Sequence, residues 1–203
     1  MHPDFRLPTL TSIDGRSSSI TAAFFKALTP VIEPSENEVD EALAILGMSR
    51  GKCFCAYCGG RRTEWDHFRP IVVAKRPTGY ITEIANLVPS CGPCNQSKGA
   101  RRWKTWITGT TAKGSPTKRS IPDLAGRIAR LETFEHWREP LCVDYERIIG
   151  PHRWQSFINR LDAIIGLLKE AQKDAVLLRG MVEHSMVQMA AQIKDELQAQ
   201  IQR

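Results

Sequence analysis

The sequence predicts a mainly α-helical fold with a small β part. The strongest observation is a C-terminal run in which apolar residues recur at steps of three and four, from Trp154 to Leu197, over about six heptads. The second is a helix-start signature at Ser35 and Glu38, which have the spacing of a capping box. The β part is expected only in the middle, within residues 50–108, a module that contains two pairs of cysteines.

Residues 1–49 are expected to form an N-terminal helical region. A short helix is predicted over about 19–28, and a better-marked one follows Pro34. In the second helix an apolar stripe follows the capping box, and Gly47 stands where a C-terminal cap belongs. The stripe consists of Val39, Leu43 and Leu46.

The C-terminal half is expected to be helical from residue 122 to 203, after a basic loop at 109–121. Asp123 can cap a first helix, whose apolar face carries Leu124, Ile128, Leu131 and Phe134. A second helix begins with Pro151 at its first position. The heptad-like stripe favours pairing with a second copy of the chain, whereas a turn at Gly180 would instead fold the helix back as a hairpin.

Charge is concentrated in the middle of the chain. Residues 50–120 hold fourteen Lys or Arg and three acids, a balance of +11, so the remainder carries −5 to give the total of +6. A solvated basic face is the simpler interpretation of such a block. Here it coincides with every chemical motif of the sequence, which favours a polyanionic partner.

The sequence shows neither a membrane span nor a signal-peptide pattern at its start. We therefore expect a cytoplasmic protein with reduced thiols. In that compartment paired cysteines more often bind a metal than form disulfides.

Two Cys-x-x-Cys knuckles predict one tetrahedral zinc site. Cys55 and Cys58 form the first pair, and Cys91 and Cys94 the second. Two residues between thiolates allow both to reach one ion, and four thiolates fill its coordination, so this Zn²⁺ would be structural. Cys53 is an alternative ligand, and Cys142 is interpreted as a core thiol.

Polar residues that suit a second metal lie between and beside the knuckles. Asp66 and Asn95 offer oxygen ligands of the kind that Mg²⁺ or Mn²⁺ prefers, and His67 offers a base that can be neutral near pH 7. An Asp-His pair alone is weak evidence. The position of this pair between two zinc knuckles in a basic block is what favours a catalytic role for it.

Together, Asp66-His67, Asn86, Asn95 and the two knuckles resemble the HNH endonucleases, also called ββα-metal nucleases. The resemblance covers about residues 53–104, with Asn95 where many members have His. It implies a ββα-metal core with zinc knuckles, flanked by N-terminal helices and a long C-terminal helical region. His67 would be the general base, Asp66 and Asn95 would hold one Mg²⁺, and Asn86 would fasten the loop that orients His67.

Neighbouring side chains of a regular strand point to opposite faces, so Asp66 and His67 must lie at a strand end or a bulge to act on one phosphate. Basic residues around this core are expected to grip DNA phosphates. The candidates are Arg61, Arg62, Arg69, Lys98, Arg101, Arg102 and Lys104.

The function predicted from these observations is that of a Mg²⁺-dependent endonuclease acting on double-stranded DNA. A type II restriction enzyme that works as a homodimer through its C-terminal helices is favoured. The alternatives are a nuclease subunit of a multi-protein antiphage defence system and a non-catalytic zinc-binding DNA module. The retention of Asp66, His67 and Asn95 together counts against the last of these.

Overall fold

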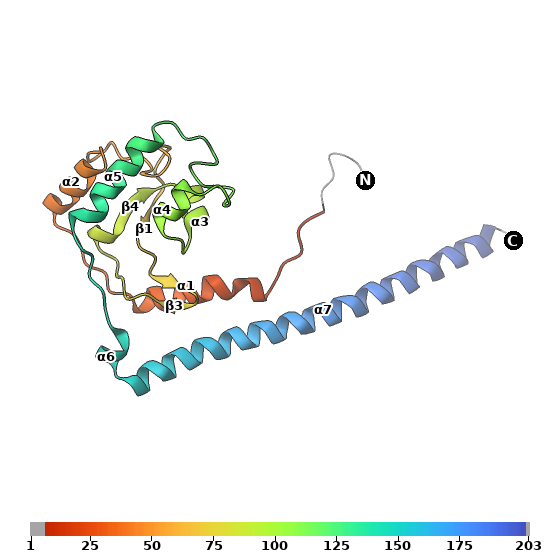
Figure 1. The fold of residues 1–203 in the computed structure, drawn as a ribbon. Helices are drawn as coiled ribbons and strands as arrows, with labels where there is room; N and C mark the ends of the chain where they lie inside the picture. Colours follow the sequence, from red (N-terminus) through yellow and green to blue (C-terminus); the bar gives the residue numbers. More distant parts are fainter. Residues whose placement is uncertain (1–6, 202–203) are drawn as a thin grey trace. The chain divides into compact units, whose positions relative to one another are not determined.

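The computed structural model describes residues 7–201, without the side chains of 195–197 and 199–201. Its contacts divide the chain into two compact units. One unit is Thr21–Pro151, and the other combines Met1–Ile20 with His152–Arg203. Each unit is described by itself below (Figure 1).

The helices expected before the cysteine module are present. A 3-10 turn, Asp14–Arg16, leads into α1, Ser17–Leu28, and α2 spans Glu36–Ile45. The capping box of α2 is complete, because Ser35 accepts from the backbone N–H of Glu38 while the Glu38 carboxylate accepts from that of Ser35. Gly47 follows the helix with φ of +72°, a left-handed conformation that glycine adopts without strain.

Two two-stranded antiparallel sheets make up the regular β part of the larger unit. Strand β1, Glu64–His67, pairs with β4, Leu87–Ser90, in the register that sets Asp66 opposite Val88 and His67 opposite Leu87. Strand β2, Val72–Val73, pairs with β3, Arg76–Pro77. The two residues between β2 and β3, Ala74 and Lys75, both have positive φ, as the favoured two-residue hairpin turn requires. A 3-10 turn, Ile84–Asn86, leads into β4.

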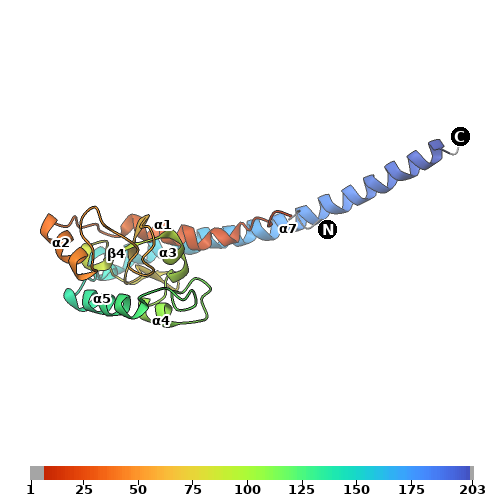
Figure 2. The same cartoon turned by 90° about the horizontal axis from the view of Figure 1, so that it is seen from above.

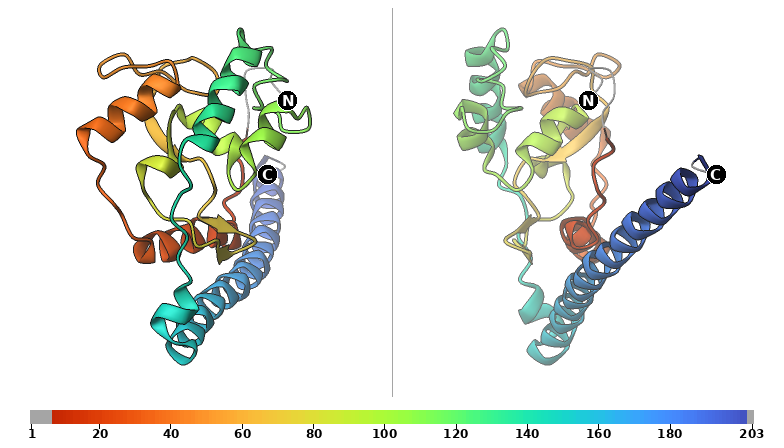
Figure 3. Two further views of the ribbon diagram at one scale, coloured as in Figure 1. Left: turned by 60° about the vertical axis from the view of Figure 1, so that its left-hand side comes forward. Right: turned by 90° about the vertical axis from the view of Figure 1, so that its right-hand side faces the viewer.

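Helix α3, Gly92–Lys98, follows β4 directly, so β1, β4 and α3 form a ββα unit. Then come α4, Trp103–Thr108, α5, Leu124–Trp137, and α6, Tyr145–Ile149. Figure 3 (left) shows α2 and α5 beside the strands. Asp123 stands at the N-cap position of α5 but makes no side-chain cap hydrogen bond, because its carboxylate pairs with Arg130 at 2.8 Å; the expected cap is therefore wrong.

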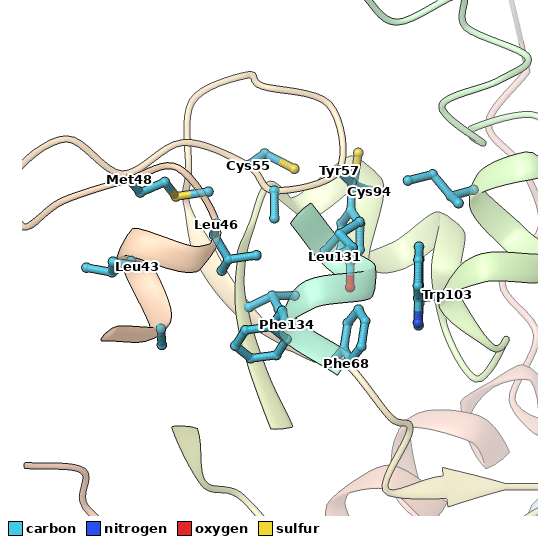
Figure 4. Packing of buried hydrophobic residues seen from close by; sticks show 14 of the residues in the cluster. Leu43, Leu46, Met48, Cys55, Tyr57, Phe68, Cys94, Trp103, Leu131 and Phe134 are labelled. Atoms are coloured by element: carbon cyan, nitrogen blue, oxygen red, sulfur yellow. The ribbon is translucent and has the colours of Figure 1, made fainter. Parts of the chain in front are cut away.

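One apolar core joins these elements. The Phe68 ring, which follows β1 directly, stacks on Trp103 of α4 with ring centroids 5.2 Å apart and meets Phe134 of α5 edge-on at 5.4 Å (Figure 4). Leu43 of α2 and Leu131 of α5 belong to the same buried cluster. The core therefore fixes the residues on both sides of His67.

The smaller unit is dominated by α7, Pro151–Ile201, a single helix without a break (Figure 2). It continues through Gly180, so the expected hairpin alternative is wrong. The N-terminal segment is tied to it, because the backbone N–H of Ile13 donates to Oε1 of Gln172 at 2.6 Å. The stripe is buried at Ile158, Leu161 and Ile165 but exposed at Leu178, Val182, Met186, Met189 and Ile193; Leu197 lies outside the described side chains.

The expected fold class is confirmed: helices predominate among the described residues, and the named strands form two small two-stranded sheets. Among residues 7–201, no helix is long and apolar enough to cross a membrane.

Candidate active site

The four cysteines of the two knuckles come together at one point of the larger unit. Their sulfur atoms all lie within 4.8 Å of one another, and Cys55 and Cys94 are fully buried. The Sγ atoms of Cys58 and Cys91 are 3.7 Å apart. Tetrahedral zinc with Zn–S bonds of about 2.3 Å separates its sulfurs by about 3.8 Å, so the cluster fits one such ion.

Tight turns hold each knuckle in place. The backbone N–H of Cys55 donates to the carbonyl of Gly60, and the N–H of Gly59 donates back to Cys55, both at 2.8 Å. The N–H of Ala56 donates to the carbonyl of Pro89 in β4, which fastens the first knuckle to the strand before the second. Cys91 is the N-cap of α3, so the same four residues also fix where this helix begins.

Zinc binds cysteine as thiolate, and one sulfur of the cluster is already set up in that form. The hydrogen bond from the Cys94 thiol lowers the pKa of Cys55 to about 4, while that same bond and burial raise the pKa of Cys94. Arg119, from the loop after α4, places Nη1 3.4 Å from the Cys94 sulfur. Its positive charge offsets part of the negative charge that four thiolates would bring.

The remaining cysteines stand apart from this cluster. The Cys53 thiol donates to the carbonyl of Ser49, and Cys53 is not one of the four clustered ligands. Cys142 is exposed, with its sulfur 3.7 Å from the carbonyl of Thr78. The interpretation of Cys142 as a core thiol is therefore wrong, because it lies in the irregular segment between α5 and α6.

Asp66 lies on the face of β1 that α3 covers. It is 4% exposed, and its Oδ2 accepts from the hydroxyl of Tyr57 at 2.6 Å. The ammonium of Lys98 lies 2.9 Å from the same oxygen and donates to the carbonyl of His67 at 2.8 Å. Burial raises the pKa of Asp66, and Lys98 and Tyr57 oppose that shift.

Asn95, which precedes Lys98 by one turn of α3, contacts the same strand. Its Nδ2 donates to Oε2 of Glu64 at 3.1 Å, and Glu64 shares a strand face with Asp66 because it is two residues away. Asp66 and Asn95 thus come from facing elements of the ββα unit. Within the described residues, neither Oδ1 of Asp66 nor Oδ1 of Asn95 has a hydrogen-bond partner.

His67 is the last residue of β1, which meets the requirement that the Asp-His pair lie at a strand end. Its Nε2 lies 2.8 Å from Oγ1 of Thr82, in the segment before the 3-10 turn. Burial, followed by the charges of Lys26 and Lys98, lowers the pKa of His67 to about 4. The imidazole is therefore neutral at pH 7, with a ring nitrogen that can accept a proton.

Asn86 is fully buried and clasps the chain that follows His67. Its Oδ1 accepts from the backbone N–H of Arg69 at 2.7 Å, and its Nδ2 donates to the carbonyls of Arg69 and Ile81, each at 3.1 Å. The N–H of Phe68 donates to the carbonyl of Asn86 at 2.8 Å. Asn86 therefore acts on the backbone beside His67.

The expected DNA-binding residues fall into different settings. Arg61, Arg101 and Arg102 are exposed, and Arg62 lies over the ring of Trp65. Lys104 is exposed but paired with Glu132 at 2.5 Å, and Arg69 is half-buried. Lys98 is fully buried with its charge on Asp66, so its expected contact with DNA is wrong.

Sequence reasoning missed several partners of the site: Tyr57, Glu64, Thr82 and Arg119. Tyr57 and Glu64 lie close in sequence to predicted ligands, but only the fold brings them to these positions: the first knuckle is fastened to β4 beside Tyr57, and β1 packs on α3 at Glu64. Thr82 and Arg119 come from segments without a motif, and no signal in the sequence marks them.

Comparison with known proteins agrees with this geometry. Residues 55–101 match the family model of HNH endonucleases. The chain is also 35% identical over 94 residues to the CRISPR-associated endonuclease Cas9 of Corynebacterium diphtheriae. That match covers 44% of this chain but 7% of the Cas9, so the chain spans a small fraction of that relative. No solved structure matches. The region from Cys55 to Arg101 is thus an HNH endonuclease domain with a four-cysteine cluster able to hold zinc.

Proposed function

We propose that this protein is a metal-dependent endonuclease that hydrolyses phosphodiester bonds of double-stranded DNA. The observation that carries the proposal is the ββα unit itself. It combines an Asp-His pair at the end of β1, an amide at the start of α3 and a four-cysteine cluster that joins the two. A module that only bound DNA would need the cysteines but not His67.

The free oxygens of Asp66 and Asn95 are the donors that would hold Mg²⁺ or Mn²⁺. Two protein oxygens with water in the other positions suit Mg²⁺, which keeps several waters when it binds. Such an ion supplies electrostatic stabilisation to the charge that develops on the leaving 3′ oxygen. The other oxygen of Asp66 stays with Tyr57 and Lys98, which hold the carboxylate in position.

His67 serves as the general base. When Thr82 accepts from Nε2–H, the lone pair of Nδ1 is left to take the proton of an attacking water. The water oxygen bonds to phosphorus as the bond from phosphorus to the 3′ oxygen breaks, which leaves a 5′ phosphate. Asn86 positions His67 by fixing the backbone of the next two residues.

Arginines at the surface then anchor the phosphate backbone, which dominates affinity for DNA. Arg61 and Arg62 follow the first knuckle, and Arg101 and Arg102 follow α3. Arg62 is half-buried over Trp65, and the other three are exposed. Lys104 can join them if it leaves Glu132.

The test is cleavage of supercoiled plasmid by the purified full chain with Mg²⁺. We expect His67→Ala to reduce the cleavage rate by about 10²–10⁴-fold, the usual contribution of a general base. DNA affinity should persist, because the arginines are unchanged. His136→Ala is the matched control, since His136 is an exposed histidine of α5 that contacts only the carbonyl of Glu132 among its hydrogen-bond partners in the described residues. Equal rates for wild type and His67→Ala would refute the assignment.

We further propose that the protein acts as a type II restriction enzyme and pairs with a second copy through α7. One such site cuts one strand, so two sites related by a twofold axis suit a palindromic sequence. The exposed apolar residues of α7 beyond Leu167 form a surface of the kind that usually binds a partner. The same surface supports a second candidate, a nuclease subunit recruited by another protein of a defence system. Sequence-specific cleavage by the purified chain alone distinguishes the first from the second.

A further inference from the structure

A cavity of about 720 Å³ opens beside the candidate active site, entirely within the larger unit. Its walls come from the chain that follows His67, from the β2–β3 hairpin and the segment after it, from α4 and the residues before it, and from Glu135 of α5. The residues that matter below are Phe68, Arg69, Tyr80, Arg102, Trp103 and Thr105. Phe68 and Arg69 directly follow His67, so the chain that leaves the Asp-His pair also forms part of the cavity wall.

The inner wall of the cavity is aromatic. Phe68 and Trp103 stack on one another and are buried, and Tyr80 is half-buried. The guanidinium of Arg69 lies between two of these rings, 5.7 Å from the centre of Phe68 and 5.9 Å from that of Tyr80. Flat rings and a guanidinium plane are the surfaces on which proteins stack unpaired bases.

Two hydrogen-bond donors in this wall have no acceptor. Nη1 of Arg69 and Nε1 of Trp103 are buried and unpartnered within the described residues, although Nη2 of Arg69 donates to the carbonyl of Glu135 at 3.1 Å. Trp103 is 3% exposed. A buried donor without a partner destabilises the fold, so a ligand that brings acceptor atoms would relieve that cost.

The outer rim is basic. Arg102 is exposed at the N-cap of α4, and Lys104 follows it at the same opening. The cavity therefore suits a molecule that has a flat ring, hydrogen-bond acceptors and an anionic group. A nucleotide has all three, and cavities of roughly 300–1,000 Å³ are the size that encloses a single small molecule.

We propose that this cavity receives one nucleotide displaced from the DNA duplex. Its base lies against Tyr80 and the guanidinium of Arg69, its acceptor atoms face Arg69 and Trp103, and its phosphate remains at Arg102. A whole duplex is too wide to enter, so only an extruded base can fill the space. This inference rests on the proposed function, because it concerns the DNA on which that site acts.

The test compares two short DNA duplexes of the same sequence, of which one has a central base without a pairing partner. Affinity for the full-length protein is measured by fluorescence anisotropy, with Ca²⁺ in place of Mg²⁺. Extrusion from paired DNA costs unpairing and unstacking energy, which the second duplex has already lost. We expect it to bind at least about tenfold more tightly.

A matched pair of variants ties that preference to the cavity. Thr105→Trp fills the cavity from the exposed face of α4, whereas Thr108→Trp adds the same bulk one turn away, at a residue that does not line it. The preference should vanish in Thr105→Trp and persist in Thr108→Trp. Equal affinities in the wild type, survival of the preference in Thr105→Trp, or its loss in both variants would each overturn the proposal.

The outcome is separable from that of the proposed function. Plasmid cleavage without a preference for the unpaired base would refute the cavity proposal and leave the nuclease intact. A preference for the unpaired base that is lost in Thr105→Trp, in a protein that cuts no plasmid, would refute the proposed nuclease activity and leave the cavity proposal standing.

Discussion

Replacing Lys98 by Met tests the buried contact on which Asp66 depends. The side chains of Lys98 and Asp66 are 0% and 6% exposed, so neither charge is solvated by bulk water. The Met side chain keeps most of the apolar stem of Lys98 and removes its ammonium. The carboxylate of Asp66 would then lack its counter-charge, and the carbonyl of His67 would lose its donor.

Removal of one partner from a buried ion pair typically costs about 3–5 kcal/mol, because the other charge is left uncompensated. The Tyr57 hydroxyl remains on Asp66 and reduces that cost, so we expect a loss of about 3 kcal/mol of unfolding free energy. The double variant Lys98→Met/Asp66→Asn removes the stranded charge as well. It should recover at least half of the loss.

Urea denaturation of zinc-loaded wild type, the two single variants and the double variant measures the coupling between the two residues. An exposed control, Lys104→Met, breaks an ion pair that water screens and should leave the urea midpoint nearly unchanged. If Lys98→Met is as stable as Lys104→Met, the buried pair does not hold Asp66, and the geometry described for the site is wrong.

Three further predictions follow from other parts of the chain. Mild EDTA should stop plasmid cleavage while about one zinc per chain remains by elemental analysis, because four thiolates hold zinc far more tightly than two oxygens hold Mg²⁺; active protein without zinc would contradict this. Asn86→Ala leaves the N–H of Arg69 and two carbonyls buried without their hydrogen-bond partner, so it should lower the unfolding free energy measured by urea denaturation by about 3 kcal/mol. Asn86→Asp keeps the acceptor for the N–H of Arg69, so its loss of stability should be intermediate. Leu178→Lys should shift light scattering from dimer to monomer, whereas Val176→Lys, on the opposite side of α7, should not; a monomeric wild type at micromolar concentration would end the dimer proposal.

The sequence predicted the parts of the fold that local chemistry determines. The capping box of α2 and Pro151 at the start of α7 are signals contained within a few residues, and the structure has both. The knuckle spacing likewise brings four sulfurs together. By contrast, no alternating apolar pattern marks the β2–β3 hairpin, whose strands have two residues each.

The side-chain partners could not be predicted, because they depend on register. Lys98 follows Asn95 by three residues in a basic run, where sequence alone favours a phosphate contact. In α3, however, residues three apart lie on the same side of the helix, so Lys98 faces β1 as Asn95 does. Asn95 contacts Glu64 of that strand, and Lys98 contacts Asp66, two residues further along it. Because glycine is a poor helix former, the sequence left a hairpin turn at Gly180 open. One glycine costs a helix only about 1 kcal/mol relative to alanine, and α7 continues through Gly180.

The unbroken α7 has a consequence for reach. At about 1.5 Å per residue, the 27 steps from Pro151 to Leu178 extend roughly 40 Å along the helix axis. A partner that binds the exposed stretch beyond Leu178 would therefore contact α7 at least that far along its axis from Pro151, a length of about twelve base pairs of DNA at about 3.4 Å each. Because an unbroken α-helix keeps its length, only the removal of residues from α7 would bring that stretch nearer to Pro151.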